Sequence, residues 1–156
     1  MKSPIRAKRE ALEGLWLQGL SGQALLRDHA KLVDEFIQEC FLDTEVPGAE
    51  ESVALVALGG YGRQELFPYS DIDLMILYRR EVSEEVGKIA DAVLYPLWDS
   101  GFEVGHGVRS VSEAVELSSD DFFFRVAMLD ARLIAGSQLL YFELLSEYRK
   151  KYVEGE

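Results

Sequence analysis

The sequence is poor in the residues that hold small domains together through covalent bonds or bound metal. Its 156 residues include one cysteine, two histidines and four prolines. A single cysteine, Cys40, excludes an internal disulfide and a cysteine zinc cluster. Because Cys40 lies among Phe36, Ile37 and Phe41, we predict a packed thiol rather than a reactive one. His29 is expected on a helix surface. Without a disulfide or a cysteine zinc cluster, noncovalent packing must hold the fold.

Long apolar runs and positive charge are also scarce. No uninterrupted apolar run approaches the roughly 20 residues that span a membrane, and the charged start lacks the apolar core of a signal peptide. Sixteen basic residues against 28 acidic ones give a formal net charge of -12, which argues against a broad electrostatic grip on nucleic acid. We therefore expect a cytoplasmic protein whose partner is a small nucleotide or another protein, with no membrane or nucleic-acid partner.

Apolar residues, in contrast, are abundant enough for a packed core. Hydrophobic residues make up 48% of the chain and aromatic residues 11%, which suits one domain of this length. We expect a single domain over 1–156, with N-terminal helices over 1–48, a catalytic core over 52–110 and trailing helices over 111–156.

Hydrophobic periodicity and capping residues predict an α+β fold. Short apolar runs predict three strands, over 53–58, 71–78 and 102–108. Helical spacing predicts helices over 4–18, 22–42, 61–66, 84–99, 112–117, 121–135 and 137–152. Ser3, Ser21 and Ser83 are expected to cap helices. The expected architecture is a helical hairpin, then a three-stranded sheet with crossover helices, then a helical tail.

The stretch 55–77 carries the strongest chemical signal. It joins an apolar run ending in two glycines to a second apolar run that contains Asp71 and Asp73. Side chains alternate along a strand, so the two carboxylates point to one side while Ile72 and Leu74 point to the other. Two close carboxylates disfavour joint ionisation unless a cation neutralises them. Magnesium is the natural partner, because one or two carboxylates and the phosphates of a substrate usually hold it.

The glycine-rich segment GGYG follows the first predicted strand. Gly60, Gly62 and Glu65 spell GxGxxE, which lacks the third glycine of a dinucleotide-binding fingerprint, and the acidic pair follows too soon for a ribose-binding acid. We instead predict a phosphate cradle, in which glycines at 59, 60 and 62 let the main chain approach and the N–H groups of a helix start attract phosphate. Arg63 adds a fixed positive charge beside Gly59 and Gly60.

The glycine-rich loop and the two carboxylates together predict a site for nucleotidyl transfer. The loop would hold a triphosphate while Asp71 and Asp73 hold a pair of magnesium ions that bridge it. Such ions activate an attacking oxygen and stabilise departing pyrophosphate. The expected substrate is therefore a nucleoside triphosphate.

Residues 59–74, GGYGRQELFPYSDIDL, resemble the signature of the bacterial PII uridylyltransferase/uridylyl-removing enzyme family, within the nucleotidyltransferase superfamily that also contains DNA polymerase beta. The resemblance continues in LWDSGFEVGHGVRS at 97–110 and DARLIAGSQLLYFEL at 130–144, so it covers most of the chain after about Ser52. It implies a polymerase-beta-like nucleotidyltransferase fold. It also implies magnesium-dependent transfer of UMP from UTP to a tyrosine of a PII-type nitrogen-regulatory protein.

The resemblance also assigns roles to individual residues. It implies that Gly59 and Gly60 contact the nucleotide phosphates and that Asp71 and Asp73 are metal ligands. Ser70, which opens the SDIDL motif, is a further nucleotide-binding candidate. Many superfamily members carry serine where this chain has Gly60, so a phosphate contact there must use the main chain.

The superfamily normally has a third carboxylate on an adjacent strand, and Glu103 is the candidate for this catalytic and metal-binding role. It alternates with Phe102 and Val104, so it can face the aspartates across the sheet and take a proton from the acceptor hydroxyl. The alternative is a solvent-facing glutamate. Arg109 is expected either to reach phosphate or to form a surface ion pair, and Glu65 is expected to brace the glycine loop.

One departure from the family matters. The full enzyme carries a hydrolase domain of the HD type and ACT domains that sense glutamine, and none of these is present in this sequence. We therefore expect either an excised domain or a short homologue. Two other functions remain open, which are nucleotidyl transfer with another base or acceptor, as in adenylyltransferases, and a non-catalytic module that senses nucleotides.

Overall fold

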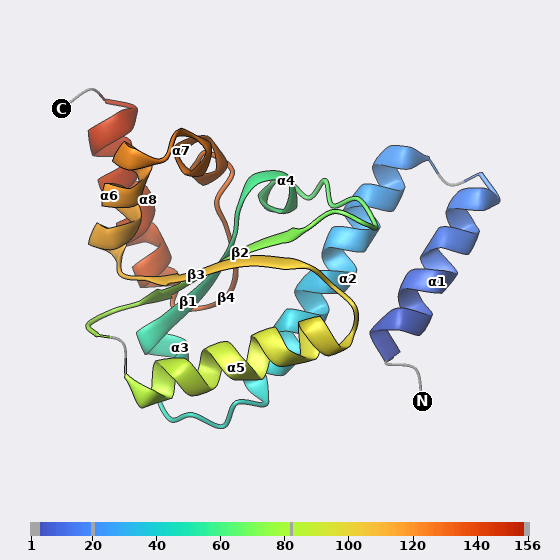
Figure 1. Ribbon diagram of the computed structural model, residues 1–156, viewed down its shortest axis with the longest axis horizontal. Coiled ribbons are helices and arrows are strands. Elements are labelled where there is room, and N and C mark those ends of the chain that lie inside the picture. The colour runs from blue at the N-terminus through green and yellow to red at the C-terminus, as the bar shows by residue number, and fades with distance from the viewer. Residues whose placement is uncertain (1–3, 20, 82, 155–156) are drawn as a thin grey trace.

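A computed structural model describes residues 4–19, 21–81 and 83–154, which form helices packed around one sheet (Figure 1). The helices are α1 Pro4–Leu17, α2 Gly22–Leu42, α3 Ala49–Ser52, α4 Gly59–Gly62, α5 Glu84–Asp99, α6 Val111–Asp120, α7 Phe122–Met128 and α8 Gln138–Tyr152. The strands are β1 Val53–Ala57, β2 Ile72–Tyr78, β3 Val104–Arg109 and β4 Arg132–Gly136. The α+β fold is therefore confirmed.

The sheet is mixed, with strand order β3-β2-β1-β4. Strand β1 pairs antiparallel with both β2 and β4, whereas β2 and β3 run parallel. The parallel pair is connected through α5, as such a pair requires a crossover. Strands β1 and β2 are almost entirely buried because they lie at the centre of the sheet.

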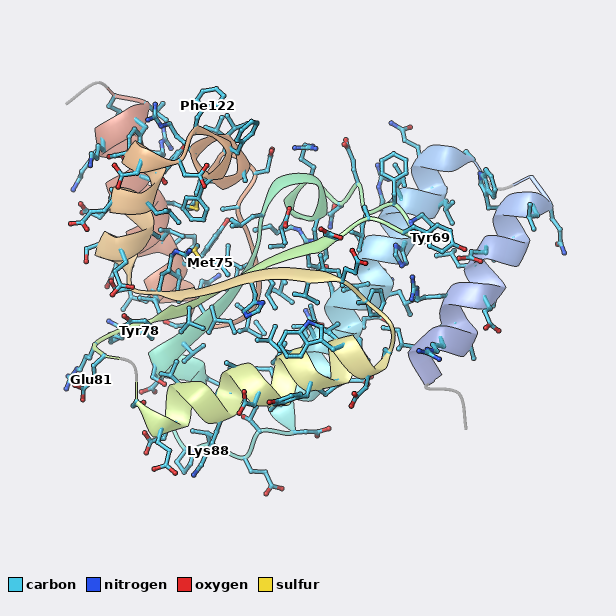
Figure 2. All side chains as sticks on the ribbon, viewed as in Figure 1. Tyr69, Met75, Tyr78, Glu81, Lys88 and Phe122 are labelled. Carbon is cyan, nitrogen blue, oxygen red and sulfur yellow. The ribbon has the colours of Figure 1, made fainter. Side chains whose placement is uncertain are left out.

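Helices cover both faces of the sheet (Figure 1). On one face, α2 and α5 pack against the odd-numbered residues of β1 and the even-numbered residues of β2. On the other face, α6, α7 and α8 pack against Ala54, Val56, Met75 and Leu77. Met75 is labelled in Figure 2 on this second side. Strand alternation therefore separates two apolar clusters, and it decides which helices the site residues face.

Capping side chains mark several helix starts. Ser21 accepts a hydrogen bond from the Ala24 N–H and Ser83 accepts one from the Val86 N–H, as predicted. Ser3, the other predicted cap, lies outside the described residues. Each cap satisfies an N–H group that the first helical turn leaves unpaired.

The prediction of a helix over 121–135 was wrong, and with it the three-stranded sheet. Helix α7 ends at Met128, and Arg132–Gly136 forms β4 on the free edge of β1. The apolar residues of this segment have a spacing that suits either element, so the decision falls to tertiary pairing. A buried strand such as β1 needs hydrogen-bond partners on both edges, and β4 supplies the second set.

Three further expectations were tested by the fold. The helix predicted over 61–66 is instead the single turn of α4, Gly59–Gly62. His29 is not on the surface, because only 2% of it is exposed and its Nδ1 lies 3.0 Å from the carbonyl oxygen of Leu66. Cys40 is half-buried against the core, and burial raises the pKa of its thiol to about 11, which confirms a packed thiol.

None of the described helices is both long and apolar enough to cross a membrane.

Candidate active site

The two aspartates lie at the beginning of β2. Asp71 immediately precedes the strand, and Asp73 is its second residue, paired in register with Gly105 of β3. Asp73 shares its face of the strand with Met75 and Leu77, which pack toward α6, α7 and α8. The carboxylate of Asp73 therefore opens into the space between the β2–β3 pair and α7.

Burial and charge act together on Asp73. Partial burial, and next the nearby Asp71 carboxylate, raise the pKa of Asp73 above its ordinary value. Both effects disfavour the ionised form, and a bound cation would relieve both. The pair consequently fits a divalent ion held by hard oxygen ligands, as magnesium prefers.

The glycine loop meets this carboxylate directly. A Cβ atom on Gly59 would lie 3.4 Å from Oδ2 of Asp73, and one on Gly105 would lie 2.8 Å from Oδ1. Gly59 also has φ +57°, a left-handed conformation that glycine adopts without strain. The loop and the carboxylate, which the sequence separates by fourteen positions, thus meet at one point.

Helix α4 supplies donors at this point. The first hydrogen bond of the turn runs from the Gly62 N–H to the carbonyl of Leu58. The N–H groups of Gly59 and Gly60 precede that bond, so they belong to the end of the turn that offers unpaired donors. Main-chain donors beside a carboxylate pair are the arrangement that a metal-bound phosphate requires.

Gly62, the third glycine of the predicted phosphate cradle, permits close packing. A Cβ atom there would lie only 2.0 Å from the carbonyl oxygen of Asp130, in the turn before β4. The glycine loop therefore rests directly on the main chain that leads into β4.

Replacing Gly62 with alanine is expected to destabilise the protein by about 2 kcal/mol or more, because the new methyl group overlaps main-chain atoms that cannot move independently. The matched control is Gly87→Ala in α5, where a Cβ atom meets nothing within 4 Å. Gly87→Ala should raise the free energy of unfolding by roughly 0.5–1 kcal/mol, because alanine has the higher helix propensity. Urea unfolding of both variants measures the difference, and equal free energies of unfolding would contradict the close approach.

The predicted phosphate ligand Arg63 is already engaged. Its guanidinium donates to Asp130 Oδ2 at 2.7 Å and to Glu65 Oε2 at 3.2 Å, and these bonds raise the pKa of the arginine. The Glu65 N–H also bonds to the Gly60 carbonyl, as expected of a residue that braces the loop. Arg63 is largely exposed, so phosphate binding there requires it to share its donors with two carboxylates.

Ser70 and Glu103 lie near the aspartates without joining them. The hydroxyl of Ser70 donates to the Phe67 carbonyl at 3.0 Å. Glu103 is exposed and precedes β3, where its carbonyl accepts a bond from the Ile72 N–H, so the register puts it level with Asp71. Among the described residues, no three His, Cys, Asp or Glu side chains form a metal-holding group. Glu103, as it lies in the structure, does not form such a group with the two aspartates.

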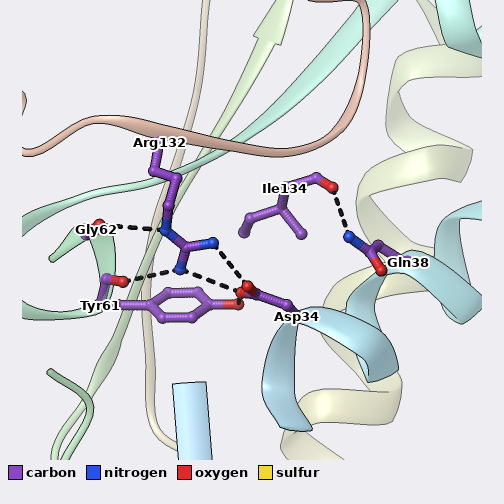
Figure 3. A network of polar contacts seen from close by, with 6 residues as sticks. All are labelled: Asp34, Gln38, Tyr61, Gly62, Arg132 and Ile134. Atoms are coloured by element: carbon purple, nitrogen blue, oxygen red, sulfur yellow. Dashed lines mark hydrogen bonds and ion pairs between the residues drawn. The ribbon is translucent and has the colours of Figure 1, made fainter. Parts of the chain in front are cut away.

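The glycine loop is held by a polar network that the sequence analysis did not predict (Figure 3). Arg132 of β4 donates to both carboxylate oxygens of Asp34 on α2, at 2.6 and 3.2 Å. It also donates to the carbonyls of Tyr61 at 2.9 Å and Gly62 at 3.1 Å. The Tyr61 hydroxyl donates to Asp34 Oδ1 at 2.6 Å. We call these contacts the Asp34–Tyr61–Arg132 network.

The Asp34–Tyr61–Arg132 network is largely shielded from water. The side chains of Arg132 and Asp34 are 23% and 14% exposed. Burial, and then the Asp34 carboxylate, raise the pKa of Tyr61 well above its usual range, so its phenol remains a donor. An acid at a core-facing helix position and an arginine within an apolar run were the available sequence signals for this buried pair.

A cleft of about 260 Å³ opens at Asp73. Its lining combines the Asp73 carboxylate and the β3 residues Gly105 and Gly107 with the Arg109 guanidinium and the aromatic residues of α7. The cleft has the scale and the mixed polar and apolar lining of a site for part of a nucleotide. Asp73 lies at this cleft, whereas Arg63 bonds to two carboxylates and is not among the lining residues.

The comparisons with known proteins agree with this geometry. A model of the nucleotidyltransferase domain family matches residues 41–125, more than half of the chain. The chain belongs to the nucleotidyltransferase domain family, and its mixed sheet with flanking helices is consistent with the polymerase-beta-like fold.

Among curated proteins, the chain is similar to several named bifunctional uridylyltransferase/uridylyl-removing enzyme. It is 37% identical to the protein of Nitrosospira multiformis and 40% identical to that of Nitrosococcus oceani, with 90% of this chain and 16% of each relative covered. It is 33% identical to the protein of Bradyrhizobium diazoefficiens, over 99% of this chain and 17% of the relative. The chain therefore spans about a sixth of the length of these relatives.

Proposed function

We propose that this nucleotidyltransferase domain transfers UMP from UTP, with magnesium, to a tyrosine hydroxyl of a PII-type nitrogen-regulatory protein. The observation that carries the proposal is the closeness of Gly59 to the Asp73 carboxylate, which puts main-chain N–H groups beside the acidic pair. The relatives are named as uridylyltransferases, which supports the choice of the uridylyl group.

In the proposed reaction, the acceptor oxygen forms a bond to the α-phosphorus of UTP. The bond from that phosphorus to the bridging oxygen breaks, pyrophosphate leaves, and the tyrosine loses its proton. Asp71 and Asp73 would hold magnesium, which supplies charge neutralisation for the phosphates and the attacking oxygen. The N–H groups of Gly59 and Gly60 would bind phosphate oxygens.

Glu103 is the proposed third carboxylate. It lies at the end of β3 that is level with Asp71, and its side chain is exposed to an approaching acceptor. In that position it would join the metal or accept the tyrosine proton. Ser70, in the turn that leads to Asp71, and Arg63 are proposed as further contacts to the nucleotide.

The proposal predicts labelling of PII by radioactive UTP in the presence of magnesium, measured with the purified chain. Asp71→Asn should abolish labelling, because a metal ligand is lost, while the exposed Asp91→Asn on α5 should leave it unchanged. Unlabelled ATP, CTP and GTP should compete weakly. Labelling that follows ATP instead would favour adenylyl transfer, and tight nucleotide binding without labelling of any acceptor would favour a sensing module.

A further inference from the structure

The proposed function leaves most of the cleft beside Asp73 without an assigned role. Asp73 and Asp121 contribute carboxylates to the described lining, and Arg109 is the one arginine or lysine there. Asp121 is already engaged, because it caps α7 by accepting a bond from the Phe124 N–H. A magnesium-bound triphosphate carries excess negative charge, so it needs a positive group within this cleft.

Arg109 has the free donors that such a ligand needs. In the part of the chain that the structure describes, its guanidinium has no ion pair or side-chain hydrogen bond, and its carbon Cζ lies 5.5 Å from the centre of the Phe124 ring. By comparison, Arg63, Arg125 and Arg132 all donate to protein oxygens. A half-buried arginine that is fixed by an aromatic ring has a full set of donors to offer to an anion.

The path of β3 directs this guanidinium toward Asp73. Gly105, Gly107 and Arg109 lie on one face of the strand, the face that Asp73 shares across the parallel register. The guanidinium folds back over Gly107, where its atoms occupy the space that a Cβ would fill. Asp73 lies in the same way against Gly105.

Two residues along a strand separate these positions by about 6.6 Å. The Asp73 carboxylate and the free guanidinium of Arg109 therefore lie over two neighbouring glycines on one face of β3. This spacing suits a chain of phosphates that extends from the metal at one end to the arginine at the other.

We propose that Arg109 binds the phosphate chain of the nucleoside triphosphate, with Gly107 leaving room for its guanidinium and Phe124 fixing its plane. The proposal rests on the function proposed above, because it assigns a subsite to the same substrate. Arg109 then contributes to substrate binding rather than to the protonation steps, so its loss should raise KM more than it lowers kcat.

The test compares Arg109→Gln and Arg109→Lys with the matched surface control Arg80→Gln. Titration calorimetry with UTP and magnesium should show affinity reduced roughly tenfold or more in Arg109→Gln, and reduced less in Arg109→Lys, which keeps the charge but loses the fork of donors. Affinity for UMP should change less than twofold, because UMP lacks the β- and γ-phosphates. Inorganic tripolyphosphate should compete with UTP on the parent protein and lose that competition on Arg109→Gln.

The results separate this proposal from the one on which it rests. Unchanged UTP affinity in a folded Arg109→Gln protein, with loss of binding in Asp73→Asn, would overturn the role of Arg109 and leave the proposed function standing. Equal losses for UTP and UMP would also overturn it, because they indicate a general distortion of the cleft. Absence of UTP binding by the parent protein would overturn both proposals. Circular dichroism on each variant confirms that the fold is retained.

Discussion

Asp73→Asn is expected to reduce nucleotidyl transfer by about 10³-fold or more while raising the melting temperature. The loss of activity follows from removing a proposed metal ligand. The gain in stability follows from the raised pKa of Asp73 in the folded protein, caused by burial and by Asp71. Ionising this carboxylate opposes folding, so the penalty is absent below the unfolded pKa, grows as pH rises and is complete above the folded pKa.

Calorimetric melting of the parent and Asp73→Asn proteins across pH measures this effect. At neutral pH the melting temperature should rise by roughly 1–2 °C, a modest figure because solvent screens the exposed part of Asp73. The difference should disappear at a pH below the ordinary aspartate pKa. Asp91→Asn should change neither activity nor melting. A less stable Asp73→Asn protein at neutral pH would contradict the conclusion that ionised Asp73 opposes folding.

Arg132→Met is expected to destabilise the protein by about 2–4 kcal/mol, because it leaves Asp34 with one donor and removes the partners of two loop carbonyls. Nucleotide affinity should fall as well, since the same bonds hold the main chain of the glycine loop. Urea unfolding and UTP titration measure the two effects on one variant.

The matched control is Lys88→Met, which breaks the exposed pair of Lys88 with Glu84 one turn away on α5. This change should cost less than about 0.5 kcal/mol. A double variant, Asp34→Leu with Arg132→Met, should lose less than the sum of the single changes, because it removes both buried charges together. Equal costs for Arg132→Met and Lys88→Met would show that the network contributes little.

The sequence predicted the parts of the site that local spacing determines. Asp71 immediately precedes β2 and Asp73 is its second residue, so the closeness of the two carboxylates follows from their spacing along one segment. The glycines of α4 are likewise recognisable from the local motif alone. The position of Glu103 relative to Asp71 was harder to predict from the sequence, because it depends on the register between β2 and β3.

The missed features all depend on contacts between distant segments. Strand β4 exists because β1 has a free edge, which the residues of 132–136 do not reveal. His29 is buried against distant segments, because its ring lies beside the Leu66 carbonyl in the loop before β2 and stacks on Phe102. Asp34 and Arg132 are separated by 98 positions, so neither residue identifies the other as its partner. Helical periodicity describes one element at a time, and tertiary pairing overrides it in such cases.

The position of Arg132 late in the chain has a consequence for the order of synthesis. A ribosome synthesises the glycine loop and both aspartates before it synthesises β4. Until residue 132 is available, Asp34 and the Tyr61 carbonyl have no guanidinium between them. The nascent chain would therefore contain every proposed metal ligand before it acquires the residue that holds the glycine loop.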